Sequence, residues 1–99
     1  MLNIDKTQNG ESAVFALEGR LDTLTVSELE SAIKEALPGL TELTFDFEKL
    51  DYISSSGLRV LLLAQKAMNG KGTMKVCKVS EAIMEIFEMT GFSDVLTIE

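Results

Sequence analysis

Strand-like and helix-like apolar patterns alternate along only 99 residues, and this alternation constrains the fold of the chain most. Helical spacing is expected over residues 26–37 and 55–69, and between Ser80 and Gly91. Strand patterns occupy residues 2–5, 13–18, 42–47, 73–79 and 95–98. The order ββαβαβαβ favours right-handed crossovers, so we expect an α/β fold whose mixed, mostly parallel β-sheet carries its helices on one face.

Turn and capping residues support these boundaries. Asn9-Gly10 favours positive φ and predicts the turn of an N-terminal hairpin. Thr25 followed by Glu28 has the spacing of a capping box, in which two side chains pair with the backbone at a helix start. No linker, repeat or low-complexity stretch interrupts the pattern, so residues 1–99 are expected to form a single domain.

The residue content argues against several classes of chemistry. The chain contains no histidine, which removes the Ser-His and Cys-His nucleophile pairs and the commonest metal ligand. Its single cysteine, Cys77, cannot form an internal disulfide, and this fits a reducing compartment. We therefore expect a protein that is not an enzyme and that has no metal site and no cofactor.

The net charge of −7 argues against direct binding to nucleic acid or to anionic membrane surfaces. The N-terminal segment lacks the basic region and apolar core of a signal peptide. The longest apolar run, residues 60–64, is far too short to span a membrane. We expect a cytoplasmic protein without membrane insertion, and these patterns leave its oligomeric state open.

Three consecutive serines and a glycine, Ser54 to Gly57, stand where a strand and turn give way to the second helix. A helix start presents unpaired backbone N–H groups and the positive end of the helix dipole. A serine there can cap the helix, or it can carry a phosphate of about −1.5 to −2 charges beside that positive end. The residues alone leave both interpretations open: a structural cap, or a switch that expels a partner without unfolding the domain.

The serine segment resembles the signature of the STAS domain family, the bacterial anti-sigma factor antagonists. The likeness covers nearly the whole chain and includes a Gly-x-Leu-Asp turn, the strand before the signature and a last helix with a Gly-Phe ending. The matching stretches are Tyr52-Ile53-Ser54-Ser55-Ser56-Gly57-Leu58-Arg59-Val60-Leu61-Leu62, Gly19-Arg20-Leu21-Asp22, Phe45-Asp46-Phe47 followed by Leu50, and residues 83–92. The resemblance implies a single STAS-type domain over residues 1–99.

The usual signature of this family, Asp-Ser-Ser/Thr-Gly-Leu, implies that Ser55 is the phosphate acceptor. Ser54 stands in place of the aspartate, which lowers the local negative charge and leaves Ser54 as the alternative acceptor. Asp22 matches an acidic residue on the neighbouring loop, and a turn carboxylate is the other interpretation. The partner-binding residues that the resemblance implies are Asp22, Ser54, Ser55, Ser56, Gly57 and Arg59.

The function that the resemblance implies is that of a partner switch. The unmodified protein would bind an anti-sigma factor that is also a serine kinase, and so free a sigma factor. Phosphorylation of Ser55 would release the kinase, and a phosphatase would reset the cycle. Two alternatives stay open: an accessory subunit of a membrane transporter, and a regulator that uses the same switch on a target other than a sigma factor.

Overall fold

Strands and helices alternate along residues 2–99, which the computed structural model describes. The elements are β1 (Leu2–Asn9), β2 (Ser12–Leu21), α1 (Val26–Ala36), β3 (Glu42–Ile53), α2 (Ser55–Met68), β4 (Thr73–Cys77), α3 (Glu81–Thr90) and a short 3₁₀ helix, η1 (Phe92–Asp94). The strands form one sheet in the order β1-β2-β3-β4, with β1 antiparallel to β2 and the other two pairings parallel. The α/β class and the mixed, mostly parallel sheet are therefore confirmed.

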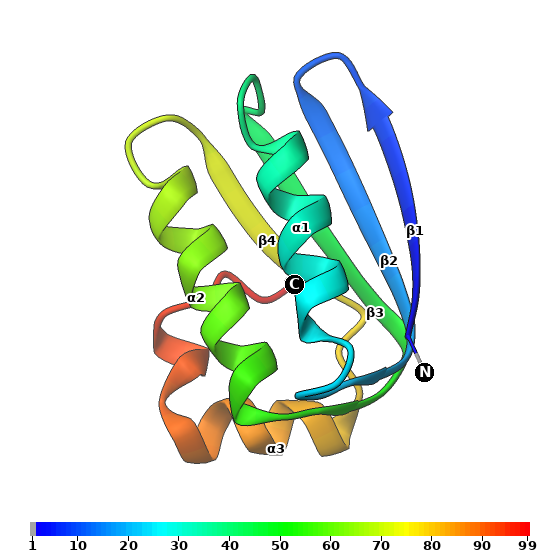
Figure 1. Ribbon diagram of the computed structural model, residues 1–99. Coiled ribbons are helices and arrows are strands. Elements are labelled where there is room, and N and C mark those ends of the chain that lie inside the picture. The colour runs from blue at the N-terminus through cyan, green and yellow to red at the C-terminus, as the bar shows by residue number, and fades with distance from the viewer. Residues whose placement is uncertain (1) are drawn as a thin grey trace.

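Helices α1 and α2 lie side by side over one face of the sheet, and α3 crosses its lower end (Figure 1). Successive side chains of a strand point to opposite faces, so an alternating pattern buries one face only. Phe45 and Phe47 of β3 are 0% exposed, whereas Thr44 and Asp46 are partly exposed on the other face. The alternation read in the sequence thus explains why one face meets the helices and the other stays open.

Aromatic rings link the sheet to α3. Phe15 and Phe45 stack with ring centroids 5.8 Å apart, and the centroid of Phe45 lies 6.2 Å from that of Phe47. The ring of Phe47 lies 6.4 Å from that of Phe87 on α3. Such pairs contribute about 0.5–1.5 kcal/mol each beyond the burial of apolar area. This row of rings ties α3 to the sheet, at the end where β2 and β3 finish (Figure 1).

Strand β3 is longer than the sequence predicted, because it runs to Ile53 instead of ending at residue 47. Its pairing with β2 is irregular at two places, one between Ala16 and Glu18 and the other between Gly19 and Arg20. Extra residues on one strand of a pair form a bulge and break the alternation of buried and exposed residues. Because the alternation is broken, the sequence pattern does not indicate the second half of the strand. This second half leads directly to Ser54.

The strand expected at residues 95–98 is wrong as an extended element, because it is reduced to a single parallel bridge between Val76 and Ile98. The backbone N–H groups of Val95 and Leu96 donate to the carbonyl of Phe92, at 3.0 and 2.8 Å. These bonds close the turn at η1 and remove both donors from any ladder with β4. Only the last residues of the chain therefore pair with β4.

The predicted capping box at Thr25 is also wrong, although α1 begins at Val26 as expected. The Thr25 hydroxyl makes no capping bond to the helix. It donates to the carbonyl of Arg20 at 2.8 Å and accepts from the backbone N–H of Asp22 at 3.0 Å. The turn before α1 uses this hydroxyl, so Thr25 holds the turn together and does not cap the helix.

Candidate functional site

The serine segment lies beside the turn that follows β2. Strands β2 and β3 are parallel neighbours, so both end at the same edge of the sheet. The backbone N–H of Ser54 donates to the carbonyl of Leu21 at 2.9 Å, which fixes the two chain segments together. Sites in open α/β sheets form at the carboxyl ends of parallel strands. The predicted neighbours Asp22 and Ser55 are therefore on adjacent segments at this edge.

The three serines of this segment differ in what their hydroxyls do. Ser54 is the N-cap of α2, and its Oγ accepts from the backbone N–H of Gly57 at 3.3 Å. The Oγ of Ser56 lies 3.4 Å from Oγ1 of Thr23 in the neighbouring turn. Ser55 is exposed, and within residues 2–99 no hydrogen bond engages its hydroxyl. The hydroxyl of Ser55 is thus the one most open to a second protein.

Gly57 is buried under the ends of both strands. A Cβ atom at this position would lie 2.8 Å from Cγ of Leu21 and 2.9 Å from Cγ1 of Ile53, closer than real contacts allow. Leu21 and Ile53 are themselves 0% and 2% exposed, so they have little room to move. The glycine thus lets the first turn of α2 approach the sheet, a structural role within the predicted binding segment.

Asp22 is chiefly a turn carboxylate in this structure. Its Oδ1 accepts from the backbone N–H groups of Leu24 at 3.0 Å and Thr25 at 3.2 Å. The Thr25 hydroxyl lies 3.2 Å from the same oxygen, and Nε of Arg20 lies 3.6 Å from Oδ2. Desolvation raises the pKa of Asp22, but these hydrogen bonds and the Arg20 charge outweigh it and lower the pKa below its ordinary value of 3.8.

Replacement of Asp22 by asparagine should lower the melting temperature by a few degrees at pH 7. The lowered pKa means that the ionised carboxylate stabilises the folded state above pH 3.8, and that this contribution disappears as the pH falls through the folded-state pKa. The difference between the wild type and Asp22→Asn should therefore shrink in acid. Thermal melts from pH 7 to pH 2 measure it, and a difference that grows in acid would contradict the assignment.

Other residues at this edge were not among the predicted site residues. Thr23 reaches Ser56 across 33 positions of sequence, and the Arg20 guanidinium carbon lies 4.3 Å from the ring centroid of Tyr52. Neither contact has a local signature, because each joins segments that meet only when β2 and β3 pair. Arg59 is exposed on α2, four residues after Ser55, so the two share one face of the helix.

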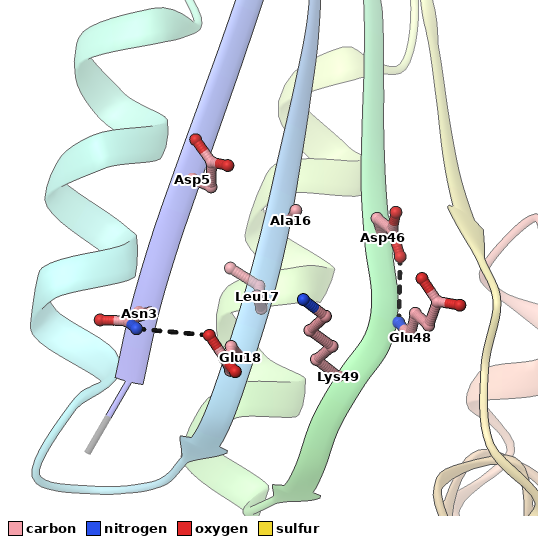
Figure 2. A pocket seen from close by; sticks show the side chains of 8 residues that line it. All are labelled: Asn3, Asp5, Ala16, Leu17, Glu18, Asp46, Glu48 and Lys49. Atoms are coloured by element: carbon pink, nitrogen blue, oxygen red, sulfur yellow. Dashed lines mark hydrogen bonds between the residues drawn. The ribbon is translucent and has the colours of Figure 1, made fainter.

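The open face of the sheet holds a separate hollow, whose polar lining residues are mostly acidic (Figure 2). Asp5, Glu18, Asp46 and Glu48 surround it together with Lys49. Its volume of about 210 Å³ is below that of typical small-molecule pockets, which hold about 300–1,000 Å³. In residues 2–99, no group of three His, Cys, Asp or Glu side chains is arranged to hold a metal ion. The hollow is thus smaller than a typical ligand site.

The sequence matches the STAS domain family over residues 3–99. The chain belongs to this family. BtrV of Bordetella bronchiseptica, which carries the provisional name of anti-sigma factor antagonist, is 30% identical over 87 residues, covering 86% of this chain and 75% of BtrV. The anti-sigma-B factor antagonist of Staphylococcus aureus is 29% identical over 99 residues, covering 98% and 92% of the two chains. These STAS relatives are thus named for a regulatory role.

Solved structures of the anti-sigma factor antagonist SpoIIAA share the fold of this STAS domain. The unphosphorylated form has a TM-score of 0.86 and 21% identity, covering 98% of this chain and 88% of SpoIIAA. The phosphorylated form from Bacillus has a TM-score of 0.78, also at 21% identity, covering 98% and 91%. At this identity the likeness confirms the STAS fold alone. Across residues 2–99, the helices are too short or too polar to cross a membrane.

Proposed function

We propose that this STAS domain is an anti-sigma factor antagonist that works as a phosphorylation-controlled partner switch. In this cycle the unmodified protein binds an anti-sigma factor that is also a serine kinase, and so frees a sigma factor. Phosphorylation at Ser55 releases the kinase, and a phosphatase restores the first state. The protein is the substrate in the cycle, the partner supplies ATP, and the exchange takes place in the cytoplasm without contact to nucleic acid.

One observation carries the proposal: the hydroxyl of Ser55 is exposed and uncommitted, while those of its neighbours are engaged. Ser54 accepts a helix-capping bond at 3.3 Å, and Ser56 lies 3.4 Å from a Thr23 hydroxyl. A kinase must reach a hydroxyl, and modification of Ser55 breaks none of these bonds. The names of the curated relatives support a sigma-factor regulator over a transporter subunit.

The local charge also suits a phosphate on Ser55. The first turn of α2 contains no acidic residue, so the phosphate would meet the positive end of the helix dipole without a neighbouring carboxylate on that turn. Arg59, one turn further along the same face, is placed to pair with it. The fold therefore tolerates the added charge. Phosphorylation instead disfavours the binding of a partner that packs against this turn.

Phosphoserine at position 55 should raise the melting temperature of the domain by about 2–6 °C, because the dianion interacts favourably with the helix dipole and with Arg59. In an Arg59→Gln background the rise should be smaller but should persist. Calorimetry of the unmodified and phosphorylated proteins measures both values. A lower melting temperature on phosphorylation would mean that the modification damages the fold, contrary to the proposed switch.

The proposed function is tested by phosphate transfer from the partner kinase. The kinase that binds this protein in its native host would be purified and incubated with ATP and each of four proteins: the wild type, Ser54→Ala, Ser55→Ala and Ser56→Ala. We expect one phosphate on the wild type and on the Ser54 and Ser56 variants, and none on Ser55→Ala. Equal transfer to Ser55→Ala, or no transfer to any protein, would contradict the proposal.

A further inference from the structure

Leu24, in the turn between β2 and α1, is 88% exposed, more than any other large apolar side chain among residues 2–99. It directly follows Thr23, whose hydroxyl lies 3.4 Å from that of Ser56. Leu24 therefore sits within one residue of a contact to the phosphate-acceptor segment. A single exposed leucine is ordinary on a protein surface, so the case for a function depends on how this leucine is held.

The backbone on both sides of Leu24 is fixed. Its own N–H donates to Oδ1 of Asp22 at 3.0 Å, and the N–H of Val26 donates to the carbonyl of Asp22 at 2.9 Å. Thr25, 9% exposed, closes the turn by donating to the carbonyl of Arg20 at 2.8 Å. A side chain held on a rigid turn loses less conformational entropy when a partner covers it, so the turn presents Leu24 ready for binding.

Leu24 does not make the contact within the domain that a leucine at this position often makes. An apolar residue just before the N-cap of a helix often packs against the fourth helical residue, an arrangement called the hydrophobic staple. Thr25 occupies the N-cap position of α1, although its hydroxyl makes no capping bond, so Leu24 and Leu29 stand at these two positions. Leu29 is 0% exposed within the core, yet Leu24 remains 88% exposed. The side chain of Leu24 thus contributes little to the fold, although its position would allow it to.

The same edge of the sheet carries other residues that dominate protein interfaces. Tyr52 is 38% exposed, and Arg20 stacks on it at 4.3 Å from the ring centroid. Nε of Arg20 lies 3.6 Å from Oδ2 of Asp22, so this pair is continuous with the turn that holds Leu24. Tyrosine and arginine are enriched among the few residues that supply most of the binding energy at protein interfaces, and an aliphatic side chain in a pocket can serve as the anchor of such a cluster.

We propose that Leu24 is the apolar anchor of the partner interface, and that it inserts into an apolar pocket of the anti-sigma factor beside the surface that covers Ser55. This inference rests on the proposed function and assigns its partner a specific surface: an apolar pocket next to a site that accepts a neutral serine. The anchor and the switch are then adjacent parts of one interface. Affinity comes from Leu24, and Ser55 decides whether the surfaces can meet.

The test is titration calorimetry with the anti-sigma factor that copurifies with Ser55→Ala from the native host, expressed and purified alone. Leu24→Ser should weaken its binding by about 10–100-fold, the loss expected when a fully buried leucine is removed. Leu24→Met should stay within about threefold of the wild type, since volume and apolar character are kept. Both variants should melt within about 2 °C of the wild type, because changes at exposed sites have small effects on stability.

The matched control is Leu63→Ser, which removes another exposed leucine, 49% accessible, from α2 eight residues beyond Ser55. It should bind as the wild type does. The inference is overturned if Leu24→Ser binds like the wild type, if Leu63→Ser weakens binding equally, or if Leu24→Ser melts far below the wild type. Ser55→Asp, titrated in parallel, reports on the proposed function separately. If Ser55→Asp loses binding while Leu24→Ser binds like the wild type, the proposal that Leu24 is an anchor is overturned and the proposed switch at Ser55 is supported.

Discussion

Ser55→Asp should weaken binding of the anti-sigma factor by at least about 30-fold, without lowering the melting temperature. A charge forced into a closed protein interface without a partner costs about 2–5 kcal/mol, and each 1.4 kcal/mol is a factor of ten in affinity. The same charge stabilises the isolated domain, because the carboxylate lies at the first position of α2 near the positive end of the helix dipole. Titration calorimetry and thermal melts of one preparation measure both effects.

Ser55→Asn is the matched control, since it has nearly the size and shape of aspartate but no charge. It should bind within about tenfold of the wild type, and Ser55→Ala should bind as tightly as the wild type does. This pair separates charge from bulk at a residue whose hydroxyl is uncommitted in the structure. Equal losses for Asp and Asn would mean that the interface rejects size, and the electrostatic account of the switch would be wrong.

Gly57→Ala should destabilise the domain by about 1–2 kcal/mol, a drop in melting temperature of about 4–16 °C. Helix propensity alone gives the opposite sign, because alanine is favoured over glycine inside a helix by about 0.5–1 kcal/mol. The added Cβ, however, would lie 2.8 Å from Leu21 and 2.9 Å from Ile53, both buried. We expect the cost of this overpacking to exceed the gain in helix propensity. The sign of the change in the free energy of unfolding shows which of the two effects is larger.

Ser56→Ala serves as the control for Gly57→Ala, because it changes the neighbouring residue of the same turn without a new contact to the core. It loses only the 3.4 Å approach to Thr23, so its melting temperature should stay within a few degrees of the wild type. Chemical denaturation of both variants gives the free energies of unfolding. A Gly57→Ala protein more stable than the wild type would show that the close approach of α2 to the sheet is not required.

The fold could be predicted from the sequence wherever one periodicity dominates. Alternation of buried and exposed residues holds through Phe45 and Phe47, and β3 was expected there. It fails between Glu48 and Ile53, where the pairing with β2 shifts register, and no local pattern marks such a shift. The capping box failed for a related reason: the Thr25 hydroxyl bonds to Arg20, five residues back, and helix-start patterns do not include that contact.

The candidate site was predicted in part. The resemblance indicated Ser55, but only the three-dimensional arrangement shows that its hydroxyl is uncommitted, since the partner of Ser56 lies 33 residues away on Thr23. The capping interpretation of the serine turn is also correct, and it falls on Ser54. Ser54 stands where the family signature has an aspartate, and its hydroxyl caps α2. The helix is therefore capped without a carboxylate next to Ser55. The oxygen of Ser54 is engaged in this cap and its side chain is only partly exposed, whereas Ser55 is exposed and uncommitted, which favours Ser55 as the acceptor.

The most direct measurement is intact-mass analysis of the protein isolated from its native host, followed by fragment mapping of residues 52–59. The account predicts a population carrying one phosphate, located on Ser55, with Ser54 and Ser56 unmodified. It also predicts that this population is absent from the fraction bound to the anti-sigma factor. A phosphate on Ser54 or Ser56, or phosphorylated Ser55 within the bound complex, would contradict the claim that the uncommitted hydroxyl of Ser55 is the switch.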